Sequence, residues 1–181
     1  MAQAISCVVS PNSAVYISGP ITTGKNFIDW YLSHGLALAS DKLIYFSRLK
    51  ADVIQNNEAA ILALASAIRS QTEASVIQPA SLFIPDWTQP DYIDFWLNII
   101  DRFSKELVMV DGWEYSVGCV SEYKFAKSKG LPIRAQSGAI VNAQEGENLI
   151  MNAIKKVEEV AGDDAVLKNL VSALQQAITG K

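Results

Sequence analysis

Short apolar, β-prone segments alternate with longer segments of helical periodicity along this chain. Strands separated by helices favour a parallel sheet covered by helices on both faces, because each connection has to cross over to return to the same edge. The sequence therefore predicts an α/β fold of the Rossmann-like, flavodoxin-like type. The predicted strands are residues 14–18, 74–78, 107–110 and a fourth that begins at 131, and the predicted helices are 26–39, 52–69, 92–103 and 118–127.

The C-terminal part of the chain continues as helix without a further strand. Residues 145–179 have the pattern of two helices parted at 162–164, which we expect to be appended to an α/β nucleotide-binding core over residues 14–134. No internal repeat and no long linker divides the sequence, and 181 residues suit one domain with a full hydrophobic core. We therefore expect residues 1–181 to form a single domain.

Composition restricts the classes of function. The net charge is −4 at pH 7, so a basic surface for nucleic acid is not expected. The N-terminus lacks a basic start, and no apolar stretch approaches membrane-spanning length, which is typical of a cytoplasmic protein with no membrane partner. His34 is the one histidine, and Cys7 and Cys119 are the two cysteines. We therefore expect neither a histidine-based triad nor a metal site, and carboxylates are left to supply any acid–base or nucleophilic chemistry.

The segment from Val110 to Glu122 carries the most informative motif. It passes from a strand through a polar turn into a helix. Ser116 can cap this helix, and Gly118 leaves its first turn without a side chain. Glu122 follows Gly118 by four residues, and this spacing puts the carboxylate on the same helix face as the glycine. Backbone N–H groups at a helix start can bind an anion. The motif predicts a site for a phosphorylated sugar with a carboxylate beside it.

A second phosphate-binding pattern lies in the loop after the first strand. Residues 19–26 nearly satisfy the P-loop pattern, and Asp111 would be the matching magnesium-binding aspartate. However, Asn26 stands where a hydroxyl should bind magnesium, and Pro20 removes one N–H donor from the loop. A P-loop kinase or NTPase is one alternative from another class, and a non-catalytic nucleotide-binding module is a second.

Several patches in a fixed order resemble the nucleoside 2-deoxyribosyltransferase-like superfamily. They are Val15–Ile21, Val76–Ala80, Asp111–Trp113 with Ser116, Gly118 and Glu122, and Gly130–Ile133. The Ser116-x-Gly118-x-x-x-Glu122 spacing is most similar to the branch that hydrolyses nucleoside 5′-monophosphates. The resemblance implies release of free base and sugar 5-phosphate, no cofactor, and a homodimer or higher homo-oligomer. A base-exchange deoxyribosyltransferase and an NAD-cleaving glycohydrolase are alternatives with related chemistry.

The resemblance also implies roles for individual residues. Glu122 would be the nucleophile at the anomeric carbon, or the carboxylate that stabilises an oxocarbenium-like centre. Ser116, with the N–H groups of Val117 and Gly118, would hold the 5′-phosphate. The other predicted substrate contacts are Tyr16, Gly19 and Ile21 for the sugar and base, Trp113 for stacking on the base, and Asp111 at its strand end. For the last two, core packing of Trp113 and turn capping by Asp111 are the alternatives.

The second polar catalytic group is left open. The superfamily places an aspartate on the preceding helix, and the spacing puts Asn98 there, with Asp94 and Asp101 one turn away on either side. We predict Asn98 and Asp101 as substrate contacts and leave the choice among the three residues open. Residues 41–70 fall outside the resemblance.

Overall fold

Four parallel strands form one sheet in a computed structural model that describes residues 5–180. Their order is β2-β1-β3-β4, which is the order of the first four strands of a flavodoxin-like sheet. The predicted α/β, Rossmann-like fold with a parallel sheet is therefore confirmed. The strands are β1 (Ala14–Ser18), β2 (Val76–Ile77), β3 (Ser104–Met109) and β4 (Ile133–Ala135).

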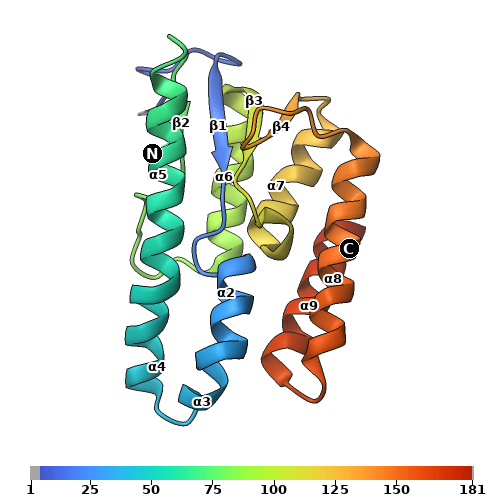
Figure 1. Cartoon of the computed structure of the whole chain (residues 1–181). Helices are drawn as coiled ribbons and strands as arrows, with labels where there is room; N and C mark the ends of the chain where they lie inside the picture. Colours follow the sequence, from blue (N-terminus) through green and yellow to red (C-terminus); the bar gives the residue numbers. More distant parts are fainter. Residues whose placement is uncertain (1–4, 181) are drawn as a thin grey trace.

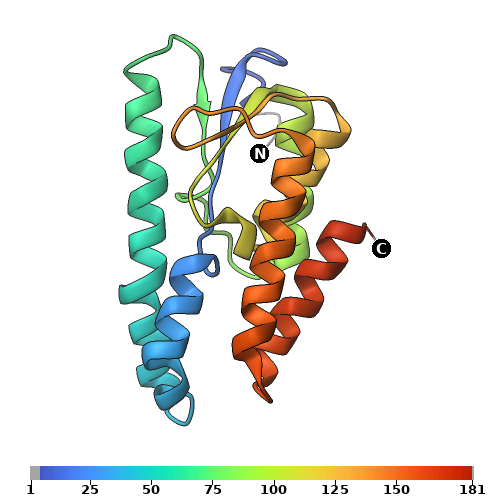
Figure 2. The same cartoon turned by 45° about the vertical axis from the view of Figure 1, so that its right-hand side comes forward.

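Helices cover both faces of this sheet (Figures 1 and 2). Helix α5 lies on one side of the strands, while α6 and α7 lie on the other, with α8 and α9 packed outside α7. The helices are α2 (Lys25–Trp30), α3 (Leu36–Leu38), α4 (Lys42–Leu49), α5 (Gln55–Arg69), α6 (Gln89–Phe103), α7 (Val117–Ser128), α8 (Ala143–Ala161) and α9 (Ala165–Thr179), with π-helical turns at Tyr31–Gly35 and Lys50–Ile54 and a 3-10 turn at Trp113–Tyr115.

Alternate residues of β1 belong to two separate hydrophobic clusters, because successive side chains of a strand point to opposite faces. Tyr16 lies in the larger cluster together with Met109 and the buried faces of α6 to α9. Ile17 lies in a smaller cluster with Ile61 and Ala65 of α5. The even-numbered positions of β1 therefore face α6 and α7, and the odd-numbered positions face α5.

The two C-terminal helices pack against the α/β core. Their buried residues recur at helical spacing, as in Ile150, Ile154 and Val157 of α8. Asp164 begins α9 by accepting from the N–H of Leu167 at 2.9 Å, and its other carboxylate oxygen accepts from the hydroxyl of Tyr31 at 2.9 Å. The predicted helix pair parted at 162–164 is confirmed. The single domain over 1–181 stays a prediction, since residues 1–4 and 181 lie outside the described part.

Several elements, such as β3 and α6, begin three residues earlier than predicted, and three further segments also differ. The strand predicted at 74–78 is only two residues long, because β2 is an edge strand that pairs with β1 alone. The helix predicted at 26–39 contains the π-helical turn at Tyr31–Gly35. Helix α4 was not predicted: Asp41 starts it by accepting from the N–H of Ile44 at 3.1 Å. No α4 residue is fully buried, but Tyr45 and Leu49 are partly buried against the larger cluster.

Two searches of residues 5–180 gave no candidate. No group of three or more His, Cys, Asp or Glu side chains in this range could hold a metal ion. No helix in the same range is long and apolar enough to cross a membrane. The expectations of no cofactor and no membrane partner stay predictions.

Candidate active site

Glu122 is a buried carboxylate with a hydroxyl donor on each oxygen. The residue is 6% exposed. The hydroxyl of Tyr16 donates to Oε1 at 2.8 Å, and that of Ser18 donates to Oε2 at 2.5 Å. Tyr16 and Ser18 point to the same face of β1 because they are two residues apart in a strand. The end of β1 and the second turn of α7 thus enclose one polar site within an apolar core.

This environment sets the protonation of the site. Burial raises the pKa of Glu122 to about 7, although the hydrogen bonds from Ser18 and Tyr16 act in the opposite direction. Burial, and then the charge of Glu122, hold the pKa of Tyr16 well above its usual value, so Tyr16 remains a donor. Near neutral pH Glu122 therefore passes between its charged and uncharged forms, as groups that transfer protons or attack electrophiles often do.

A row of short polar side chains leads from Glu122 to the loop after β1. The thiol of Cys119 lies beside Ser116 and Ser18, and burial raises the pKa of this thiol to about 12 although these hydroxyls lower it, so it stays neutral. The hydroxyl of Thr23 donates to Oγ of Ser116 at 3.2 Å. Thr23 belongs to the loop that connects β1 to α2. This loop therefore lies against the start of α7.

The start of α7 offers neutral donors. Ser116 is its N-cap residue, but the hydroxyl makes no capping hydrogen bond, which corrects the expected side-chain cap. The first N–H groups of a helix have no partner within the helix. A Cβ added at Gly118 would lie 3.5 Å from Nε2 of Gln89, so an amide donor stands beside the bare first turn. This set of donors suits an anion at the helix start.

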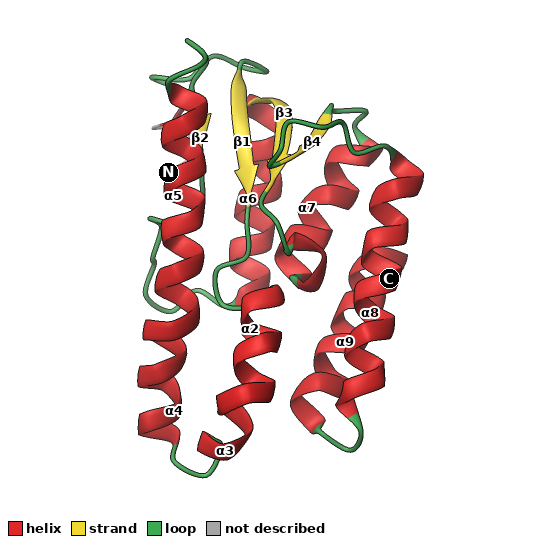
Figure 3. Ribbon diagram, in the orientation of Figure 1, coloured by secondary structure: helices red, strands yellow, loops and turns green. Residues whose placement is uncertain are grey.

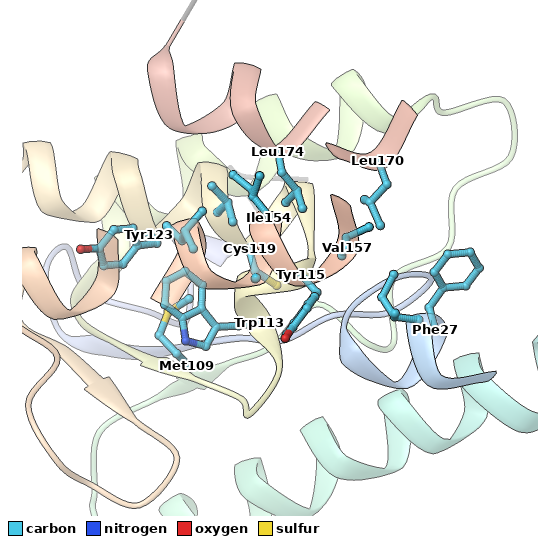
Figure 4. Close-up of a cluster of buried hydrophobic side chains, with 14 of the residues drawn as sticks. Phe27, Met109, Trp113, Tyr115, Cys119, Tyr123, Ile154, Val157, Leu170 and Leu174 are labelled. Atoms are coloured by element: carbon cyan, nitrogen blue, oxygen red, sulfur yellow. The ribbon is translucent and has the colours of Figure 1, made fainter. Parts of the chain in front are cut away.

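Three predicted contacts face away from Glu122. A Cβ added at Gly19 would lie 2.6 Å from Cγ1 of Ile61, so this glycine packs against α5. Ile21 is partly buried against the same α5 cluster. Trp113 is 4% exposed and its ring centroid lies 4.9 Å from that of Tyr123. Figure 4 shows this indole among buried side chains, so core packing replaces the predicted base stacking.

The candidates for the second polar group are not brought to Glu122. Asp94, Asn98 and Asp101 are all exposed, on the face of α6 turned away from the core. Asp101 pairs with Nζ of Lys129 at 2.6 Å. The residue of α6 that does reach the site is Trp96, whose ring centroid lies 5.9 Å from that of Tyr16. Helix α6 thus contributes an apolar wall to the site.

Asp111 lines a separate cleft at the carboxyl ends of β1 and β3. The N–H of Asp111 donates to Oε1 of Gln136 at 3.2 Å. Lys25, the lysine of the P-loop-like segment, is not in the lining, and its Nζ pairs with Asp29 at 2.5 Å. The cleft has a volume of about 220 Å³ and is lined by Pro20, Asn26, Asn57, Ala60, Val110, Asp111 and Gln136.

Some of the predicted residues lie together in the site, and other residues of the site were not predicted. Glu122, Tyr16, Ser116 and Gly118 do lie around one polar site. Ser18 was missed, although its spacing of two from Tyr16 in a predicted strand places both side chains on one face. Cys119 and Thr23 had no signal of this kind.

The middle of the chain matches a family of unknown function. Residues 44–135 match DUF4406, described as a domain of unknown function. The match covers just over half of the chain, so the protein belongs to this family. The matched range includes Ser116 and Glu122 but not Tyr16 and Ser18. The chain matches no curated protein and no solved structure.

Replacing Glu122 by Gln tests the raised pKa of Glu122, because this pKa makes the free energy of unfolding depend on pH. Burial raises the pKa of Glu122 to about 7, above the ~4.3 of a free Glu side chain, so the folded state binds this proton more tightly than the unfolded chain. The stabilisation is present at low pH and is lost as pH rises. Wild type should therefore lose roughly 3 kcal/mol relative to Glu122→Gln between about pH 4 and pH 8.

Urea unfolding of both proteins across this range measures the difference. Glu73→Gln, which changes an exposed carboxylate, serves as the control and should show no such trend. A difference between wild type and Glu122→Gln that does not change with pH would contradict the description of the site.

Proposed function

We propose that this protein hydrolyses the N-glycosidic bond of a nucleoside 5′-monophosphate and releases a free base and a sugar 5-phosphate. The observation that carries the proposal is the buried Glu122 carboxylate, held by Tyr16 and Ser18 beside the start of α7. A carboxylate next to an anion-binding helix start suits a reaction at the anomeric carbon of a phosphorylated sugar. The resemblance to the nucleoside 2-deoxyribosyltransferase-like superfamily agrees with this chemistry.

In the proposed mechanism the ionised form of Glu122 acts. One oxygen forms a bond to the anomeric carbon, or stabilises positive charge there, while the bond from that carbon to the base nitrogen breaks and the base takes a proton from water. Water then adds to the same carbon and releases the carboxylate. Tyr16 and Ser18 hold the carboxyl group in one orientation, which reduces the rearrangement that the transition state requires.

The start of α7 is the proposed phosphate site. Ser116 and the N–H groups of Val117 and Gly118 would bind the 5′-phosphate, and the amide of Gln89 stands close enough to the first turn to add a donor. All of these donors are neutral, so the helix start supplies the favourable electrostatic field.

The same site can support related reactions. A second base in place of water would make the protein a base-exchange deoxyribosyltransferase, and NAD in place of a monophosphate would make it an NAD-cleaving glycohydrolase. We also propose a cytoplasmic homo-oligomer. Support for assembly comes from exposed apolar side chains on α3 and α4, where Leu36, Leu43 and Phe46 are 46%, 83% and 62% exposed.

A panel of nucleoside 5′-monophosphates, analysed by chromatography for free base, tests the proposed reaction. We expect at least one monophosphate to lose its base without ATP or magnesium, and Glu122→Gln to lower turnover by roughly a thousandfold or more while remaining folded. Base release near the wild-type rate in Glu122→Gln would remove the central claim. Activity that required magnesium and ATP, and was lost in Lys25→Ala, would instead support the P-loop alternative in which Asn26 and Asp111 line the cleft.

Ser116→Ala tests the phosphate site. Loss of the hydroxyl should raise KM for monophosphates by a factor that corresponds to about 1–3 kcal/mol, and should change KM for the matching nucleosides little. Ser121→Ala, one turn further along α7 with a hydroxyl that bonds the carbonyl of Val117 at 2.9 Å, is the matched control. Equal activity of wild type on nucleosides and monophosphates would favour the transferase and contradict a 5′-phosphate site.

A further inference from the structure

The site around Glu122 is closed in this structure. Tyr16 and Ser18 are completely buried, and Ser116 and Glu122 are 5% and 6% exposed. On the Ser116 side the closing element is the loop Gly19–Gly24, whose Thr23 bonds Ser116. A ligand that bonds Ser116 and reaches Glu122 therefore has to displace this loop, although Val117 and Gly118 are only partly buried.

The loop Gly19–Gly24 and the loop that follows β3 leave the same end of the sheet (Figure 3). Gly24 and Gly112 have φ of +88° and +82°, a region that other residues rarely adopt. A Cβ added at Gly24 would lie 3.4 Å from the carbonyl oxygen of Gly112, and one added at Gly112 would lie 2.9 Å from Cβ of Lys25. A side chain at Gly112 would therefore clash with the start of α2, whereas one at Gly24 would clash with Pro20 of its own loop, whose Cβ would lie at 2.5 Å.

A buried amide on α5 holds the loop in place. Asn57 is 3% exposed, and its Nδ2 donates to the carbonyls of Ile21 at 2.9 Å and Thr23 at 3.1 Å. Its Oδ1 accepts from Nδ2 of Asn26 at 2.8 Å. Every partner of this side chain therefore lies in the loop or in the first turn of the helix that follows it.

Helix α5 fixes the position of this amide. Asn57, Ile61 and Ala65 form one stripe at a spacing of four residues, and Ile61 and Ala65 are completely buried against the sheet. The amide thus projects from a packed helix, whereas its partners are backbone carbonyls of a connecting loop. We therefore expect the loop to move and the helix to stay in place.

We propose that Asn57 is a positioning residue of the site: it holds the loop Gly19–Gly24 closed over the start of α7, and the loop opens to admit a ligand. This gives Asn57 a function in the site, although residues 41–70 lie outside the resemblance to the nucleoside 2-deoxyribosyltransferase-like superfamily. The proposal does not depend on which reaction Glu122 supports. Opening breaks the two bonds from Asn57 and the contact between Thr23 and Ser116, so the closed form is the resting form.

Thiol labelling of Cys119 reports the opening, because this thiol is 3% exposed and lies beside Ser116, which Thr23 of the loop bonds. Cys7→Ser provides a background in which Cys119 is the only cysteine. In this background Asn57→Asp keeps the size of the side chain but replaces both N–H donors by an oxygen that repels the two carbonyls. We expect Cys119 to be labelled roughly tenfold faster than in the parent, a factor consistent with the loss of two hydrogen bonds.

Asn56→Asp is the matched control, since the neighbouring amide is exposed and bonds only the carbonyl of Asp52 at 2.7 Å. It should label at the parent rate. Urea unfolding of each variant shows whether the fold is intact, and Asn57→Ala replaces Asn57→Asp if the buried carboxylate unfolds the protein. Labelling of the folded Asn57 variant at the parent rate would overturn the proposal. A labelling rate that follows global unfolding in every variant would also overturn it.

Discussion

The parallel pairing of β1 with β3 is the constraint on which the site depends. Ser18 lies opposite Met109 in the register of these strands, so both strands end at the same edge of the sheet. The loop after β1 and helix α7 after β3 are therefore forced into contact. Because side chains alternate along β1, Tyr16 and Ser18 face α7 while Ile17 faces α5. One face of β1 thus supplies hydroxyl groups to the Glu122 carboxylate, and its other face packs against α5.

Burial of the Glu122 carboxylate lowers the stability of the folded protein at neutral pH, so a function would explain its presence here. Its two hydroxyl donors offset only part of the burial, as its pKa of about 7 shows, and no Lys or Arg forms an ion pair with it within residues 5–180. An apolar residue of similar size would fill the space without this cost. A strained electrostatic environment of this kind is typical of reactive groups. The acids of α6, in contrast, lie exposed at the surface.

Local patterns in the sequence predicted most of the strands and helices. Most of the site residues that were not predicted depend on contacts between segments far apart in the chain. The apolar run at 14–18 and the Gly118–Glu122 spacing lead directly to β1 and α7. The prediction of Asn98 and Asp101 used spacing from a family pattern and ignored helix phase, which puts them on the face opposite Trp96. Asn57 could not be predicted, since its partners lie more than thirty residues away in the chain. Ser18 was predictable from strand alternation alone.

The pH dependence of base release tests the central claim most directly, because it links the reaction to the ionisation of Glu122. The account predicts that kcat/KM for the preferred monophosphate rises with pH through an apparent pKa near 7, since the ionised carboxylate is the reactive form. In Ser18→Ala the rise in rate should occur at higher pH. The hydrogen bond from Ser18 favours the charged form of Glu122, so its loss raises the pKa of this carboxyl. A value of kcat/KM that is constant from about pH 5 to pH 9 would contradict the assignment of Glu122 as the reactive group. An apparent pKa that is the same in Ser18→Ala as in wild type would also contradict it.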